Sequence, residues 1–154
     1  MALEITTVGA SVKYAVETTA GTRPTTGYTE IPDISSAPEI SLEVDALDAS
    51  NITDLITRYT AGRQDPGGNK EFTCNHTEAF ITAWETMKTA SDTARAAGKA
   101  TWIEYVYPNA TKSFFFSIIP LALGNGGIEQ NSVDTIPAPF IVNGVEGWAA
   151  KSTT

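Results

Sequence analysis

The residues best suited to covalent chemistry are Cys74 and His76, the single cysteine and the single histidine of this 154-residue chain. They stand two apart in a segment that favours a strand, so both side chains are expected on one face, as in a Cys-His dyad. The sequence offers no residue that would orient the histidine and no oxyanion site. We therefore predict that Cys74 is a small core residue, that His76 flanks a helix start, and that the chain is not an enzyme.

Metal and phosphate sites are no better supported. One cysteine and one histidine cannot make a closed metal site, and Asp45 and Asp48 lack the spacing and the central glycine of a calcium loop. The run from Gly124 to Gly127 is followed by no Lys-Ser or Lys-Thr pair, which predicts a turn and not a phosphate-binding loop. We expect no catalytic, cofactor-binding or metal-binding residues.

Acidic residues are in excess and are separated from the basic ones along the chain. The formal net charge is −8, which argues against a nucleic-acid-binding surface because phosphate contacts require Lys and Arg. No base occurs between Glu30 and Thr57, where the acids are Glu30, Asp33, Glu39, Glu43, Asp45, Asp48 and Asp54. Ser113 to Ala150 also lacks bases, and its acids are Glu129, Asp134 and Glu146. Such runs are ordinarily solvated faces, but they could also line a negative surface.

The elements that must position these residues read mostly as strands, which predicts one mainly β domain over residues 1–154. A strand over Val12 to Val16 precedes a Thr- and Gly-rich loop at residues 18–27. Alternation over Pro38 to Asp45 predicts a strand with a core face and an acidic face. The core face would carry Ile40, Leu42 and Val44; the acidic face would carry Glu39, Glu43 and Asp45.

One helix is expected over about residues 76–90. Asn75 is the predicted N-cap, with Glu78 completing a capping box. An apolar stripe of Phe80, Trp84 and Met87 recurs at helical spacing. Gly98 is a natural stop, although the weak amphipathic pattern beyond residue 89 favours an earlier end.

The strongest apolar signal is a hairpin formed by residues 101–107 and 113–123. Both of its strands are apolar on both faces, which suggests a second burial surface. The alternative is a central strand pair of a sandwich with the helix packed outside. A last strand over about residues 132–142 contains Pro137 and Pro139, which predict an edge or a bulge. The remaining tail, residues 144–154, is expected to be ordered only by a neighbour.

The segment at about residues 46–69 is predicted to be a long polar loop with apolar anchors. Loops of this length inside compact domains are uncommon unless they are functional or disordered. The residues expected to contact another subunit or ring are Ile52, Ile56, Tyr59, Arg63 and Asp65.

The order of these features resembles the tail-tube proteins (major tail proteins) of long, non-contractile bacteriophage tails. The resemblance rests on the Val12 to Val16 strand, the Thr/Gly arm, the run Tyr28 to Ile34 and the run Pro38 to Asp48. The long loop, one helix, an aromatic hairpin and a closing strand follow. Asp45 departs from the pattern, because members often carry Thr there.

The resemblance implies an antiparallel β-sandwich or barrel flanked by one α-helix, with a long loop and terminal arms. It implies hexameric rings that stack into a tube through these segments, with the inner sheets joined around a lumen that DNA passes without specific binding. The partners would be a tape measure protein, a tail terminator and a distal tail protein. The expected lumen residues are Glu39, Glu43, Asp45, Glu129 and Asp134.

The expected location is the virion tail, assembled in the bacterial cytoplasm. The start of the chain shows no signal peptide, and no run reaches the ~18 apolar residues of a spanning helix, so no membrane role is expected. Two other classes stay open. One is another ring- or tube-forming β-module, such as a head–tail joining protein or a type VI secretion tube subunit. The other is a monomeric β-sandwich that binds a sugar or a protein.

Overall fold

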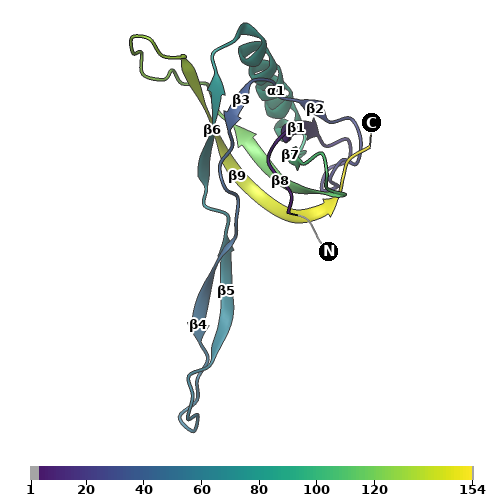
Figure 1. Ribbon diagram of the computed structural model, residues 1–154. Helices are drawn as coiled ribbons and strands as arrows, with labels where there is room; N and C mark the ends of the chain where they lie inside the picture. The colour runs from purple at the N-terminus through teal and green to yellow at the C-terminus, as the bar shows by residue number, and fades with distance from the viewer. Residues whose placement is uncertain (1–3, 154) are drawn as a thin grey trace.

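The computed structural model describes residues 4–153 and confirms the mainly β fold. Seven strands form one curved antiparallel sheet in the order β2-β1-β7-β8-β9-β6-β3, with α1 packed against it (Figure 1). Strands β4 and β5 form a separate two-stranded sheet that projects from the body. The elements are β1 (Ser11–Val16), β2 (Thr29–Glu30), β3 (Ile34–Ser36), β4 (Glu43–Asp48), β5 (Tyr59–Asp65), β6 (Asn69–Asn75), α1 (Glu78–Ala96), β7 (Thr101–Val106), β8 (Lys112–Pro120) and β9 (Thr135–Ala150).

The helix packs through the predicted stripe, since Phe80, Trp84 and Met87 are all fully buried. The predicted bounds are wrong at both ends. The N-cap is Thr77, whose hydroxyl accepts a 3.1 Å hydrogen bond from the Phe80 backbone N–H, because Asn75 is still paired in β6. The helix continues past Ala90 to Ala96 since Ser91 and Ala94 keep one face buried, and Gly98 follows with a positive φ.

The predicted aromatic hairpin is the β7–β8 pair, and the same chain covers most of both its faces, leaving Tyr105 and Phe114 half-buried. One face, with Ile103 and Phe116, joins the core that contains the helix. On the other face Phe115 is buried beneath Tyr28 and Arg23, and the Arg23 guanidinium lies 3.9 Å from the centre of the Phe115 ring. The arm thus supplies the second burial surface for which the sequence suggested a neighbouring subunit.

The last strand differs most from its prediction. β9 runs from Thr135 to Ala150 and lies between β8 and β6, so the prolines are not at an edge. Pro137 and Pro139 are tolerated because their backbone faces the irregular segment after β8, where their carbonyls accept from Gly124 and Leu121 and no proline donor is needed. Much of the predicted tail therefore pairs with β8 within the chain.

The segment at residues 46–69 is not a loop. Its ends form the ladder of β4 and β5, in which Glu43 lies opposite Asp65 and Asp48 opposite Tyr59. The predicted strand from Pro38 with a buried face is also wrong, because β4 starts at Glu43 and all its residues are exposed. Only Ile40 of the predicted core face packs against the core.

Candidate assembly surface

The end of the β4–β5 hairpin displays a cluster of aliphatic side chains with no cover. Ile52 and Leu55 are 104% and 101% exposed, and Ile56 is 79% exposed. We call these three residues the tip. Soluble proteins seldom expose a contiguous apolar cluster unless it binds something. Figure 1 shows the hairpin pointing away from the sheet, so these side chains lie far from the chain's own core.

Polar side chains hold the tip in shape from within. Asp48 accepts a 2.8 Å hydrogen bond from the Ser50 backbone N–H, and these bonds from Ser50 lower the pKa of the Asp48 carboxyl. Asp54 accepts from the Asn51 backbone N–H at 2.7 Å and from the Arg58 Nε at 3.0 Å. The Asp side chains bond to the turn backbone, as is usual in surface turns. The unusual feature is that aliphatic side chains face solvent in the same turn.

One face of the hairpin places two acids directly opposite each other. Directly opposed residues of an antiparallel pair share a face, so Glu43 and Asp65 stand side by side, with Asp45 two residues further along β4. The register shifts between Val44 and Ala46. Like charges in opposed positions are destabilising, so this acidic face costs the isolated subunit stability.

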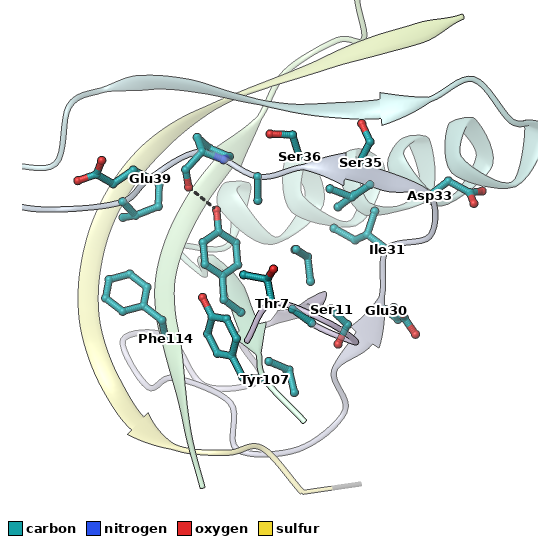
Figure 2. A pocket seen from close by; sticks show the side chains of 18 of the residues that line it. Thr7, Ser11, Glu30, Ile31, Asp33, Ser35, Ser36, Glu39, Tyr107 and Phe114 are labelled. Carbon is teal, nitrogen blue, oxygen red and sulfur yellow. Dashed lines mark hydrogen bonds between the residues drawn. The ribbon is translucent and has the colours of Figure 1, made fainter. Parts of the chain in front are cut away.

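A groove lies in the sheet body beside the root of the hairpin. It has a volume of about 790 Å³ and is bounded by the chain leading from β2 to the hairpin and by the ends of β7, β8 and β9. Its aromatic floor consists of Tyr105, Tyr107, Phe114 and Trp148. Figure 2 shows Phe114 and Tyr107 side by side in this space. Trp148 packs edge-on against Phe114 at 5.3 Å and is still 60% exposed.

The rim of the groove is acidic. Glu30, Asp33 and Glu39 line it, and its lining contains no Lys or Arg. Glu30 and Glu39 lie at opposite ends of the groove in Figure 2. The Tyr105 hydroxyl donates a 3.1 Å hydrogen bond to the Pro38 carbonyl, which ties this wall to the floor. Burial raises the pKa of Tyr105, so the phenol stays protonated and keeps this donor.

The sheet also has an open edge. β6 pairs with β9 only as far as Ile141, and among the described residues β9 beyond Val142 pairs with β8 alone. Two register shifts in the β8–β9 ladder bend this part of the strand. An edge of this length offers a row of backbone donors and acceptors to another strand.

The five acids predicted to face one lumen do not gather in the single chain. Glu39 lies on the groove rim, whereas Glu43 and Asp45 lie on the hairpin. Glu129 and Asp134 lie in the connection between β8 and β9, at the other end of the molecule in Figure 1. The predicted contact residues Ile52, Ile56, Tyr59, Arg63 and Asp65 are all exposed and all on the hairpin.

The fold is similar to that of chains in two anti-feeding prophage (AFP) structures. One is the cryo-EM structure of the AFP cap, the tube terminating cap, at TM-score 0.64 and 13% identity, covering 97% of this chain and 93% of that one. The other is the six-fold symmetrised AFP baseplate, at TM-score 0.60 and 11% identity, covering 97% and 98%. No protein-family model matches the chain, and no curated protein matches its sequence. At this identity the likeness shows the shared fold.

The Thr/Gly arm and the end of the chain pack on their own sheet. Arg23 pairs with Glu146 of β9, and the Thr153 backbone N–H donates to the Thr25 carbonyl at 2.9 Å. The carboxylate of Glu104, fully buried in β7, accepts hydrogen bonds from the backbone N–H and the hydroxyl of Ser152 at 3.0 and 2.6 Å. The arm predicted to bridge subunits therefore also has contacts within its own chain.

Cys74 and His76 do not form a dyad. Cys74 is fully buried, and burial raises the pKa of its thiol to about 12, so it remains protonated at neutral pH. His76 is exposed beyond the end of β6, with Nδ1 2.5 Å from the Asp134 carboxylate. That partner was not foreseen, because it lies 58 residues away in sequence. It ties the β8–β9 connection to the helix start.

Sequence reasoning found the tip but missed the groove. Trp148 was assigned to a tail, and its neighbours Tyr107 and Phe114 were read as parts of an apolar hairpin. A tryptophan among small residues after Gly144 and Gly147 was the available signal. Only the pairing of Trp148 opposite Phe114 turns these residues into one surface.

Proposed function

We propose that this chain is a structural subunit of a phage-tail-like particle. It polymerises as stacked hexameric rings into the tail tube, which forms a negatively charged conduit for DNA. The tip carries this proposal, because a solitary chain gains nothing from three uncovered aliphatic side chains on a projecting hairpin. The fold shared with chains of the AFP cap and baseplate structures supports a tube-related role. The phage tail tube itself also rests on the sequence resemblance.

The energetics favour docking of the tip but require more contact than the tip alone. Fully burying an aliphatic side chain is worth about 1.5–3 kcal/mol, and the tip has three. Association costs about 4–15 kcal/mol in lost translational and rotational freedom. The tip gain is of the same order as this cost, so a stable ring stack needs a second interface.

The open edge of β9 is suited to be that second interface. Pairing it with a strand of the next subunit would satisfy its free backbone groups and continue the sheet around a ring. A hairpin of two strands is also marginally stable in water by itself. Docking would therefore stabilise β4 and β5 as well as bury the tip.

The acidic face of the hairpin supports the conduit part of the proposal. Glu43, Asp45 and Asp65 would present negative charge to passing DNA and repel its phosphates. Glu129 and Asp134, in the β8–β9 connection, would line the same conduit at the opposite end of the subunit, with Glu39 nearer the sheet.

The test is direct imaging of concentrated protein by negative-stain electron microscopy, with sedimentation velocity in parallel. Wild-type chain is expected to form tubes, and the triple variant Ile52→Ser, Leu55→Ser, Ile56→Ser is expected to remain small. Val8→Ser is the matched control, because Val8 is 80% exposed and lies outside the hairpin. Persistent monomers of the wild type at high concentration would contradict the proposal.

A second variant tests the conduit alone. Replacing Glu43 and Asp45 together with Lys should leave tube assembly intact, because both are exposed and neither lines the groove. The added positive charge should slow DNA release from particles that carry the variant. Unchanged kinetics of DNA release would contradict the assignment of these acids to the lumen, but not the proposal that the chain forms a tube.

A further inference from the structure

We propose that the groove of one subunit receives the tip of another copy of this chain. This inference rests on the proposed assembly function and names the surface that the hairpin binds. The floor is Tyr105, Tyr107, Phe114 and Trp148, and the incoming segment is residues 49–58.

The groove has a partly exposed aromatic floor and a suitable size. Its volume of about 790 Å³ is within the 300–1,000 Å³ of pockets that enclose small ligands. Tyr107 and Phe114 are half-buried, and Trp148 is 60% exposed. An apolar side chain placed over them would bury the remaining ring surface as well as itself.

The chain's own tip cannot fill its own groove. The hairpin leaves the body at the groove wall, and the six residues of β4 carry the tip about 20 Å away at ~3.3 Å per residue. Figure 1 shows the hairpin continuing outward with no return toward the sheet. The exposed tip and the open groove are therefore on the same chain but can meet only between two chains.

Charge does not oppose the match. The groove rim has Glu30, Asp33 and Glu39 and no base. The incoming segment is neutral, because its one acid, Asp54, pairs with its one base, Arg58. The tip can therefore approach an acidic rim without like-charge repulsion.

The contact is heterologous, because a tip and a groove are different surfaces. Each subunit both donates and receives, so one contact type repeats without limit or closes into a ring. A second exposed aliphatic pair, Ile128 and Val133, lies in the β8–β9 connection at the other end of the molecule. That connection is the competing acceptor, and the experiment must separate the two.

Cysteine cross-linking within assembled protein can distinguish the groove from the β8–β9 connection as the surface that binds the tip. Leu55→Cys on the tip is mixed with Ser36→Cys, an exposed neutral position on the groove wall. In parallel it is mixed with Ser132→Cys, an exposed position in the β8–β9 connection. Native Cys74 does not interfere, because it is buried and its thiol pKa is raised to about 12.

The expected result is a disulfide-linked dimer on a non-reducing gel for the groove pair. Its yield should exceed that of the Ser132→Cys pair by at least about tenfold, because docking raises the local thiol concentration. Trp148→Ser, with the tip intact, should weaken assembly, and Val8→Ser should not. Circular dichroism spectra matching wild type would show that these variants fold.

Each contrary outcome is informative. If tubes form but Leu55→Cys cross-links to Ser132→Cys as much as or more than to Ser36→Cys, the groove is not the acceptor, although the assembly function stands. Unchanged assembly of a folded Trp148→Ser variant would do the same, and would point to a foreign ligand such as a sugar. Failure of the wild-type chain to assemble would overturn both proposals together.

Discussion

The chain contains two β-hairpins that treat apolar side chains in opposite ways. In the β7–β8 hairpin the helix covers most of one face and the N-terminal arm with the C-terminal residues covers the other, while Tyr105 and Phe114 stay partly open at the groove. In the β4–β5 hairpin both faces and the tip are exposed. The helix and the arm cover the apolar side chains of β7–β8, but no segment of the described chain covers those of β4–β5. The comparison therefore separates residues that stabilise the subunit from residues left for a partner.

The largest effect should come from removing a ring inside the buried hairpin. Phe116→Ala should reduce the free energy of unfolding by about 3–5 kcal/mol, because Phe116 is fully buried and leaves a cavity. Leu55→Ala in the exposed hairpin should change it by less than about 0.5 kcal/mol. Urea unfolding followed by fluorescence measures both. Similar losses for the two variants would show that the tip is already buried in solution.

A smaller effect is expected where the C-terminal residues cover the buried hairpin. Glu104→Ala removes the acceptor for both Ser152 donors and should cost about 1–3 kcal/mol. Amide hydrogen exchange at residues 151–153 should quicken. Glu104→Gln is the control, because it keeps one of the two acceptor oxygens and should therefore lose less stability than Glu104→Ala. Unchanged exchange in Glu104→Ala would mean that the tail is held elsewhere.

Alkaline pH should loosen the arm that covers Phe115. Burial raises the pKa of Tyr28 to about 12, above its unfolded value of ~10. The folded state therefore favours the neutral phenol, and the stability this gives is complete below pH ~10 and is lost as pH rises toward 12. Ultraviolet difference spectra with limited proteolysis at residues 18–27 can follow the change. An arm equally resistant across that range would contradict it.

The smallest change concerns the acidic face of the exposed hairpin. Glu43→Thr removes the like charge opposite Asp65 and should stabilise the hairpin by about 0.2–1 kcal/mol. Asp65 is kept, because its carboxylate accepts a 2.8 Å hydrogen bond from the Gly67 backbone N–H. Hydrogen exchange in β4 and β5 should slow in the unassembled subunit. Glu85→Thr, on the exposed surface of α1, is a control of equal charge change. A faster exchange in Glu43→Thr would show that Glu43 has a stabilising partner within the chain.

Local sequence patterns determined the elements that pack against a core. The stripe of Phe80, Trp84 and Met87 predicted the helix, and the aromatic runs predicted β7 and β8, because burial imposes a period on the side chains. The exposed aliphatic residues at positions 52 and 56 were also recognised as anchors from sequence.

The sequence could not reveal β4 and β5 as a ladder. Strands exposed on both faces have no buried side, so their residues show no helical or strand period, and the segment reads as a loop. The alternation of Ile40, Leu42 and Val44 predicted a buried face, but only Ile40 packs against the core, because the chain leaves the body before β4. The ladder is defined by cross-strand pairing between residues distant in sequence, such as Glu43 opposite Asp65, which the sequence does not show.

Only the tertiary structure decided how the two ends of the chain are used. Gly147, with a positive φ, and the register shifts let β9 continue past residue 142 beside β8, which places Trp148 opposite Phe114 and forms the groove floor. The arm covers Phe115 because its own backbone bonds to the last residues. These contacts join segments distant in sequence, and composition at either segment alone does not specify them. The sequence determined which side chains are apolar and gain from burial. The tertiary structure decided which of them are buried within one chain.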